Sequence, residues 1–322
     1  MPLINRRNFL SLMAPAFGLA GCGKPPAPPF RLATYLWPGY EPFFLAREMQ
    51  MLGNHRIQLL EFPSAAECIL AFQNRVVDAV TLTADEVIRL AQAGHEPQIV
   101  MLIDFSNGTD VIVAKREFAS LRELKGKVIG VENNTLGSFF LARALEVSGL
   151  TSADVKTVNC RADQCERDFA LGKLDAAVTY DPYRQRMVAA GARQIFDSSK
   201  LPGEIMDTLV VRRSVMDNPP RALSGLVSGW FQALESIAKN PAETAGRMAP
   251  RENATPEALL ESLKGIQLLG RKENRELLGA KDSLLPAKLQ RLADYLLKSG
   301  LIATPVDTAH LLNGTLVMEE SP

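Results

Sequence analysis

Short apolar runs alternate with helical segments from residue 31 to about residue 213, and this alternation restricts the fold more than any other feature of the sequence. Strands separated by helices at this spacing build parallel-rich sheets that are flanked by helices. We therefore predict an α/β fold. The predicted strands cover residues 31–36, 56–62, 77–82, 98–103, 110–114, 128–131, 155–158, 175–179, 194–196 and 209–212.

The last third of the chain has a different pattern, in which helical periodicity continues without any predicted strand. Because it has no sheet of its own, this part must pack as an all-helical addition against the preceding α/β part. The predicted helices cover residues 220–239, 241–248, 255–265, 271–279, 284–298 and 305–313.

The first 21 residues have the layout of a signal peptide. Two arginines precede an apolar run, and small residues follow it. The run is too short to cross about 30 Å of hydrocarbon comfortably, and Pro15 interrupts it. We therefore expect residues 1–21 to direct export and then to be removed.

The residues that follow predict an attachment to a membrane. Residues 19–22, Leu-Ala-Gly-Cys, resemble a bacterial lipobox, whose cysteine is acylated and becomes the mature N-terminus. An ordinary small residue at the cleavage site is the alternative for Cys22. Residues 22–29 then form a lipid-anchored, Pro-rich linker. We expect a periplasmic, membrane-anchored lipoprotein, and the sequence leaves open whether the inner or the outer membrane holds it.

Four sequence blocks in the α/β part resemble one family of proteins. They are Trp-Pro-Gly-Tyr-Glu-Pro at 37–42, Val-Asp-Ala-Val with Thr-Leu-Thr-Ala-Asp-Glu at 77–86, Leu-Arg-Glu-Leu-Lys-Gly-Lys at 121–127, and the segment 172–183. Their combination is similar to the periplasmic solute-binding proteins of ABC transporters, in the group that binds nitrate, sulfonates, taurine and thiamine precursors (pyrimidines).

The resemblance implies a two-lobed periplasmic binding protein of type II. Its two lobes close on a ligand, and two crossing segments, near 104–114 and 206–213, connect them. Lobe I would contain residues 30–108 and 208–322, and lobe II residues 109–207. The implied partners are a small organic ligand and an ABC permease with its ATPase, and we expect a monomer. A periplasmic sensing module that docks a membrane-bound signalling protein is the second interpretation.

Polar and aromatic side chains follow the predicted strands, where open α/β sheets bind ligands. They come from the ends of several strands and from the two crossings. We predict that the ligand-binding residues are Trp37, Gly39, Tyr40, Thr81, Thr83, Asp85, Asp104, Glu132, Thr135, Gly137, Ser138, Tyr180, Asp181, Tyr183 and Asp207.

Two features of this set indicate the kind of ligand. Thr135, Gly137 and Ser138 open a helix, and the free amides of a first turn attract an anion. Five carboxylates and several aromatic rings instead suit a cationic nitrogen. We therefore expect an amine or a zwitterion, such as an aminosulfonate. Helix caps and hinge salt bridges are the alternative roles for the carboxylates, above all for Asp85 and Asp181.

Other classes of function find little support in the sequence. The 36 basic and 36 acidic side chains balance, whereas nucleic-acid binding favours a basic excess. Neither a His-Glu-x-x-His nor a Cys-x-x-Cys pattern occurs, so we expect no metal and no cofactor. We expect no catalysis, and an enzyme related to pyrimidine synthases is the third interpretation. Cys160 and Cys165 could form a disulfide in an oxidising compartment, or they could stay reduced.

Overall fold

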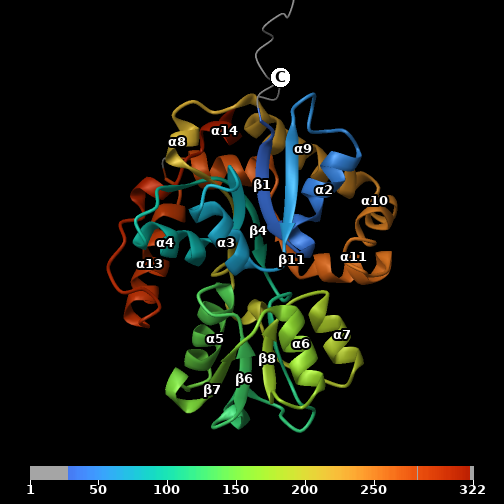
Figure 1. Ribbon diagram of the computed structural model, residues 1–322, viewed down its shortest axis with the longest axis vertical. Coiled ribbons are helices and arrows are strands. Elements are labelled where there is room, and N and C mark those ends of the chain that lie inside the picture. The colour runs from blue at the N-terminus through green and yellow to red at the C-terminus, as the bar shows by residue number, and fades with distance from the viewer. Residues whose placement is uncertain (1–27, 281, 320–322) are drawn as a thin grey trace, which may run out of the picture.

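The computed structural model describes residues 28–280 and 282–319, which form two lobes, one above the other in Figure 1. The predicted signal peptide, Cys22 and most of the Pro-rich linker lie outside the described residues. The sheet of the first lobe contains β1 (Phe30–Tyr35), β2 (Ile57–Phe62), β3 (Ala79–Thr83), β4 (Pro97–Ser106), β10 (Met206–Arg212) and β11 (Ile266–Leu268). The sheet of the second lobe contains β5 (Val111–Ala114), β6 (Val128–Val131), β7 (Lys156–Asn159), β8 (Ala176–Thr179) and β9 (Arg193–Asp197).

Both sheets are mixed rather than parallel-rich, although the two-lobed α/β fold itself is as expected. The strand orders are β11-β4-β10-β3-β1-β2 and β7-β6-β8-β5-β9. β1 is parallel to β2 and β3, and β6 is parallel to β7 and β8. β10 is antiparallel to β3 and β4, and β5 is antiparallel to β8 and β9. The reason is that a strand entering a lobe from a crossing begins at the cleft, where its neighbours end.

The chain crosses between the sheets at 107–110 and at 198–205. The expected return crossing at 206–213 is therefore wrong, because these residues already form β10 and its continuation. The expected lobe boundary at residue 207 falls inside this strand. The two crossings bind one another through Ser198, whose hydroxyl lies 2.8 Å from the Ser106 hydroxyl and accepts from the Gly108 amide at 2.6 Å.

The helices that flank the two sheets begin where the sequence places capping residues. At the start of α3 the Ser64 hydroxyl accepts a hydrogen bond from the Glu67 amide and caps the helix. At the start of α4 the Glu86 carboxylate accepts from the Thr83 amide at 3.0 Å. The first lobe has α2 (Glu41–Glu48), α3 (Ala65–Gln73) and α4 (Ala84–Gln92), and the second has α5 (Leu136–Val147), α6 (Ala162–Ala170) and α7 (Tyr183–Ala189).

The C-terminal part packs against the first lobe, as expected for an all-helical addition, but it is not strand-free. The strand β11 extends the first sheet beside β4. Three residues are too few to give a periodic pattern in the sequence. In the predicted helix 305–313 only the short 3-10 turn η6 (Ala309–Leu311) forms. The helices are α8 (Arg213–Met216), α9 (Arg221–Lys239), α10 (Pro241–Met248), α11 (Pro256–Lys264), α12 (Arg271–Asn274) with the π-turn η5 (Arg275–Gly279), α13 (Leu285–Lys298) and α14 (Thr315–Met318).

Packing of the C-terminal helices on the first lobe involves large apolar side chains. Trp230 of α9 is fully buried, and its ring lies 4.6 Å from that of Phe43 in α2. None of the helices in the described residues is both long and apolar enough to span a membrane.

One buried side chain in this part completes the hydrogen bonding of β4. The Asn274 amide oxygen accepts from the Leu102 amide at 2.7 Å, and its nitrogen donates to the Leu102 carbonyl at 2.9 Å. Asn274 is fully buried. It therefore acts for one residue as an additional strand beside β4, which carries Asp104 to the cleft.

Substituting this side chain should destabilise the protein strongly. Asn274→Ala leaves the buried Leu102 amide and carbonyl without partners, at a cost of about 1–3 kcal/mol for each group. We expect the free energy of unfolding, measured by urea denaturation, to fall by roughly 2–4 kcal/mol. The exposed Asn74 provides the control, since Asn74→Ala should change stability by less than about 0.5 kcal/mol. Similar effects of the two substitutions would contradict the role assigned to Asn274.

Candidate functional site

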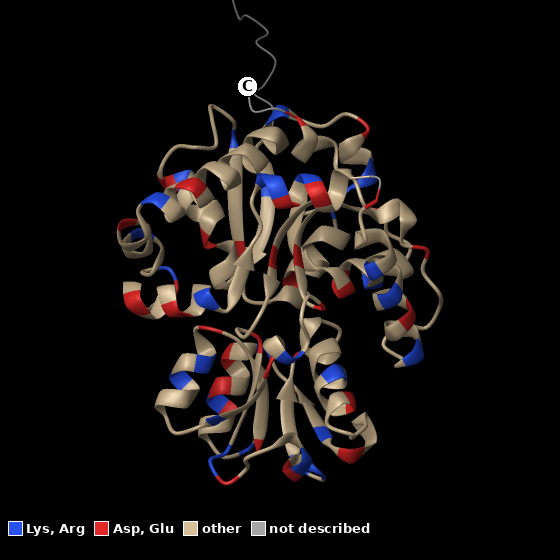
Figure 2. Cartoon of the chain, turned by 180° about the vertical axis from the view of Figure 1, so that it is seen from behind, with Lys and Arg blue, Asp and Glu red and all other residues tan. Residues whose placement is uncertain are grey.

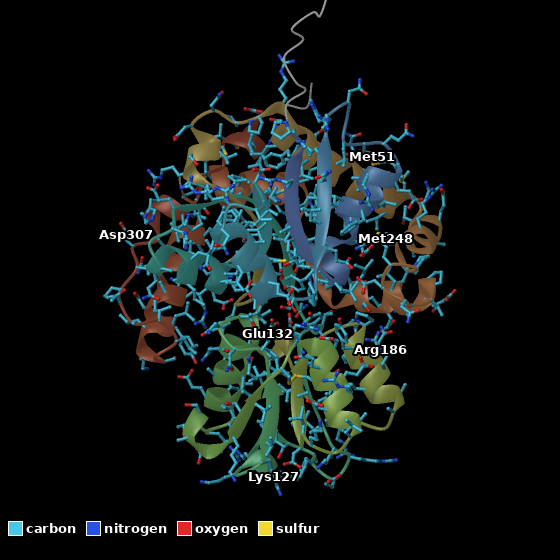
Figure 3. The ribbon with its side chains drawn as sticks, viewed as in Figure 1. Met51, Lys127, Glu132, Arg186, Met248 and Asp307 are labelled. Atoms are coloured by element: carbon cyan, nitrogen blue, oxygen red, sulfur yellow. A yellow bond between two sulfur atoms is a disulfide. The ribbon has the colours of Figure 1, made fainter. Side chains whose placement is uncertain are left out.

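A cavity lies between the two lobes, where strands of both sheets end. Figure 3 shows Glu132 at this junction, and in Figure 2 backbone segments coloured as Asp or Glu lie on both sides of it. The cavity volume is about 40 Å³, room for roughly three waters. The lining residues are Tyr35, Trp37, Ala65, Glu86, Asp110, Glu132, Thr135, Leu136, Gly137, Phe140, Cys160, Ala162, Val178, Tyr180 and Asp207.

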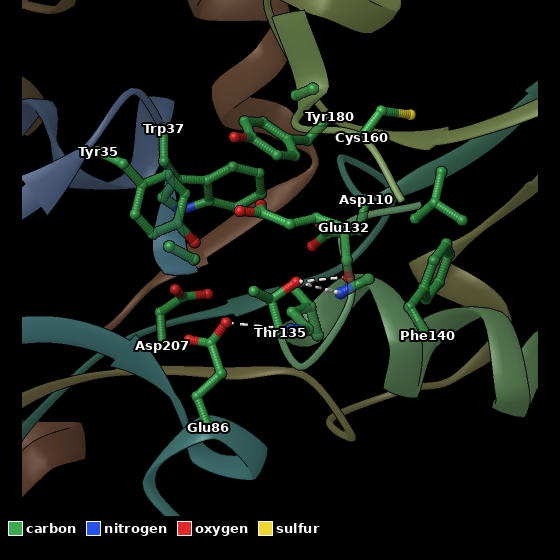
Figure 4. A pocket seen from close by; sticks show the side chains of 15 residues that line it. Tyr35, Trp37, Glu86, Asp110, Glu132, Thr135, Phe140, Cys160, Tyr180 and Asp207 are labelled. Carbon is green, nitrogen blue, oxygen red and sulfur yellow. Dashed lines mark hydrogen bonds between the residues drawn. The ribbon is translucent and has the colours of Figure 1, made fainter. Parts of the chain in front are cut away.

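Six of the predicted residues line this cavity. They come from both lobes and are brought together by the strand ends, as the sequence analysis expected. Figure 4 shows Trp37 and Tyr180 on one side and Thr135 opposite them. The six are Trp37, Glu132, Thr135, Gly137, Tyr180 and Asp207.

Nine lining residues are absent from the predicted ligand-binding set, among them Tyr35, Glu86, Asp110 and Phe140. Tyr35 is the last residue of β1, and Asp110 lies in the first crossing just before β5. Phe140 lies one turn inside α5 and has no polar group to mark it. Glu86 occupies the third position of α4, where the capping-box pattern from Thr83 could have identified it as a residue at the cleft end of β3.

Several predicted residues form a layer behind the lining. The Trp37 indole nitrogen donates to Asp104 at 3.3 Å, and Asp104 is fully buried. The Tyr40 hydroxyl donates to Asp207. The Tyr183 ring lies 5.5 Å from the ring of Tyr180. Asp104, Tyr40 and Tyr183 do not line the cavity themselves. Each contacts a lining side chain and restricts its orientation.

Asp85 and Asp181 are not among the lining residues. For these two acids a helix cap or a salt bridge was the main alternative to ligand binding. Asp85 lies 3.7 Å from Arg89 and accepts from the Thr83 hydroxyl at 2.7 Å. Asp181 lies 2.6 Å from Arg184 and accepts from the Ser262 hydroxyl at 2.7 Å. Each has an arginine and a hydroxyl as partners within the protein.

The other predicted residues also lie outside the lining. Thr81 and Thr83 are buried in β3, and the Ser138 hydroxyl donates to the Glu132 carbonyl at 3.3 Å. Gly39 stands behind Trp37. A side-chain carbon at position 39 would collide with both the Trp37 indole and the Asp104 carboxylate, so glycine is required for these two groups to meet.

Burial raises the pKa values of the acidic groups in and behind the lining. It raises the pKa of Glu86 to about 8 and those of Asp104 and Asp110 to about 7. The pKa of Asp207 is raised well above its usual range, first by burial and then by the nearby Asp104. Within the described part of the chain, none of the fifteen lining residues is lysine or arginine, so no basic side chain in the lining offsets this effect.

The start of α5 differs from the free anion site that the sequence predicts. The Leu136 amide donates to a Glu86 carboxylate oxygen at 3.0 Å, across the cleft. The Gly137 amide donates to the Thr135 hydroxyl at 3.3 Å, and the Ser138 amide donates to the Thr135 carbonyl at 3.1 Å. Each of these three amides therefore already has an acceptor within the protein.

The cysteines complete the description of the site. Cys160 and Cys165 are joined by a disulfide with an S–S distance of 2.00 Å, and Cys160 contributes to the cavity lining. Cys68 is free and buried. Across residues 28–280 and 282–319, no group of three or more His, Cys, Asp or Glu side chains has an arrangement that could hold a metal ion.

Comparison with known proteins places this chain in a family. The sequence profile of the NMT1-like family matches residues 23–250, which is more than half of the 322 residues. The chain belongs to the NMT1-like family. This match confirms the family that the four sequence blocks predicted.

Individual relatives of this NMT1-like protein are distant in sequence. A Brucella abortus protein, named only as a candidate binding protein, is 23% identical over 215 residues. That alignment covers 65% of this chain and 66% of the relative, so it spans slightly less than two thirds of the relative's length.

Solved structures of related fold confirm the two-lobed architecture. The alkanesulfonate-binding protein SsuA from Xanthomonas axonopodis pv. citri, bound to MOPS, has a TM-score of 0.76 at 17% identity, covering 88% of this chain and 98% of SsuA. The periplasmic aliphatic sulphonate binding protein SsuA from Escherichia coli has a TM-score of 0.72 at 17% identity, covering 89% and 92%. At these identities the likeness concerns the fold alone.

The role of Gly39 in this NMT1-like protein can be tested directly. Gly39→Val forces Trp37 away from Asp104, and overpacking of this kind costs about 1–3 kcal/mol of stability. We expect a lower melting temperature and an altered tryptophan emission spectrum, because Trp37 is one of two tryptophans and the other, Trp230, is buried in the core.

Gly246 provides the matched control for this substitution. A side chain at this exposed position of α10 meets open space. Gly246→Ala should leave the emission spectrum unchanged and stabilise the helix slightly, by up to about 1 kcal/mol. An unchanged emission spectrum of the Gly39→Val variant would show that the position of Trp37 does not depend on the absence of a side chain at residue 39.

Proposed function

We propose that this protein is the solute-binding component of an ABC importer and acts on the outer side of the cytoplasmic membrane. Its membership of the NMT1-like family and its fold, which it shares with two SsuA proteins, support this role. In this proposal Cys22 holds the protein on a membrane through a lipid and the Pro-rich segment up to residue 29 acts as a spacer. The monomeric protein would deliver its ligand to a permease and its ATPase.

The acidic lining of the cavity supports a ligand with a cationic nitrogen. Glu86, Asp110, Glu132 and Asp207 line it without any basic residue. A bare anion in this cavity would be repelled by these groups, whereas an ammonium group would donate charge-assisted hydrogen bonds to them. This composition is the observation on which the proposal for the ligand class rests.

Two of these acids, Asp110 and Glu132, have a buried carboxyl oxygen without a hydrogen-bond partner among the described residues. Asp110 is 4% exposed, and its Oδ2 atom finds no hydrogen-bond partner among the described residues. A buried carboxylate oxygen without a donor is costly, and a ligand N–H group would remove that cost. Because Asp110 is buried whereas Glu132 is only partly buried, Asp110 is the acid that we expect to contact the ligand most directly.

Aromatic rings provide the rest of the binding surface. The rings of Trp37 and Tyr180 lie 5.6 Å apart, and those of Tyr35 and Tyr180 lie 6.1 Å apart, in edge-to-face arrangements. Such rings bind a cation through their electron-rich faces and bury the apolar part of an organic ligand. Between the two expected ligand classes we favour the amine, since the anionic end of a zwitterion would need the α5 amides that already have acceptors.

We propose binding without chemical conversion. The one thiol group that the cavity lining could offer, that of Cys160, is bonded to Cys165 and is not available as a nucleophile. Transport and sensing would use the same closed form, so the partner protein distinguishes them. Co-purification of the full-length protein with a permease and an ATPase would support transport.

Ligand binding can be measured by calorimetry with primary amines, quaternary ammonium compounds, aminosulfonates and simple sulfonates. We expect an amine or a quaternary ammonium compound to bind the wild type. Asp110→Asn should weaken this binding by roughly 10–100-fold, because a hydrogen bond to a charged group contributes about 1.5–3 kcal/mol.

Asp217 serves as the control, because it is an exposed acid outside the cavity. Asp217→Asn should bind the same ligand with unchanged affinity. Binding of sulfonates alone, or equal amine binding by the Asp110→Asn variant, would contradict the proposed ligand class.

The raised pKa values predict that cation binding depends on pH. Glu86, Asp104, Asp110 and Asp207 lie close to one another together with Glu132, Tyr35 and Tyr40, and burial favours the protonated forms of the four acids. A cation favours the ionised forms, so its binding releases protons. Affinity for a quaternary ammonium ligand, whose own charge is constant, should rise from about pH 6 to about pH 8 and then level off.

The stability of the free protein should show the opposite trend. In the folded state these acids hold protons at pH values where the unfolded chain has lost them, so the unfolding free energy should fall as the pH rises from about 5 to about 8. Calorimetry in two buffers of different ionisation enthalpy measures the released protons, and urea denaturation measures stability. An affinity that falls with rising pH would contradict the prediction.

A further inference from the structure

The carboxyl group of Glu86, in the first lobe, accepts hydrogen bonds at the N-termini of two helices. One oxygen of Glu86 accepts from the Thr83 amide at 3.0 Å and caps its own helix, α4. The other oxygen accepts from the Leu136 amide at 3.0 Å, at the first residue of α5 in the second lobe. Glu86 is fully buried and lines the cavity, and Figure 4 shows its carboxylate directed at the start of α5.

The position that Glu86 occupies is the one that an anionic ligand would otherwise take. Free amides and the positive end of the helix dipole make a helix start attractive to anions. At the start of α5, however, Leu136 donates to Glu86, and Thr135 accepts from the two following amides. An entering sulfonate would have to displace Glu86 before it could bind there.

Glu132, on the opposite side of the cleft, lies near a helix start of the other lobe, as Glu86 does. Glu132 belongs to the second lobe and lies near the start of α3 in the first lobe. Burial raises its pKa, and the Ser64 hydroxyl and the Ala66 amide oppose that rise by hydrogen bonding to the ionised form. Acids of each lobe thus reach a helix start of the other lobe.

We propose that Glu86 is a specificity-determining residue, which acts as a built-in acceptor at the start of α5 and thereby excludes sulfonates and other anionic solutes from the cavity. This inference rests on the proposed solute-binding function and deepens it. A side chain that only held the lobes together would behave differently, because its removal would not create an anion site.

The test compares the wild type with Glu86→Ala and Glu86→Gln by calorimetry, with ethanesulfonate and sulfate as probes. Glu86→Ala frees the Leu136 amide and removes one acid, so we expect anion binding to become at least about tenfold tighter. Glu86→Gln keeps the size of the side chain, but its NH₂ group would face the backbone amide of either Thr83 or Leu136. We therefore expect a smaller gain in anion affinity. Melting curves of both variants confirm that they fold.

The control is Glu67→Gln. Glu67 is also an acid in the first turn of a helix of the first lobe, and it lies 3.3 Å from Arg161 of the second lobe, but it does not line the cavity. Its substitution removes a contact between the lobes and should leave anion binding at the wild-type level. An equal gain in this variant would mean that a loosened cleft, rather than a vacated anion site, explains the effect, and it would overturn the proposal.

Two other results would also overturn it. The first is ethanesulfonate binding by the wild type as tight as that of Glu86→Ala. The second is the absence of any gain in both folded Glu86 variants. Because the readout is anion binding, failure of every amine to bind the wild type would remove the proposed ligand class and leave this test unaffected.

Discussion

Desolvation of carboxyl groups between the lobes is the constraint on which the other features of the site depend. Strands of both sheets end at the cleft and bring Glu86, Asp110 and Asp207 to the cavity. Asp104 lies directly behind them and binds Trp37. Such acids are costly to ionise without a cation. The proposed preference for a ligand that supplies positive charge rests on these same buried acids.

The contacts between the lobes follow from this arrangement. Ser198 binds the two crossing segments to one another at the hinge, while Glu86 and Arg161 make contacts across the cleft. Ser198 thus joins the second crossing to Gly108 in the first crossing and to Ser106 at the end of β4. In the proposed role as a solute-binding protein, the contacts across the cleft would break when the lobes open and re-form when they close.

The sequence predicted what depends on local pattern and missed what depends on distant partners. Strand ends identified Trp37, Glu132 and Tyr180, because the residue after a strand is placed by the strand itself. Glu86 was not selected because its capping role is local, whereas its second partner, Leu136, lies fifty residues away in the other lobe. The start of the return strand was also misplaced, because β10 acquires its sheet only by pairing with β3 and β4. The motif resemblance predicted the family and the two-lobed fold, and both are confirmed by comparison.

The short strand β11 has a consequence for association between molecules. It ends the first sheet with only three residues, and the Asn274 side chain occupies the backbone groups of Leu102 further along β4. A long open strand at this border would offer a row of free amides and carbonyls to a second chain. Here most of that row is already used or interrupted by a side chain, so this border of the sheet is a poor template for edge-to-edge aggregation.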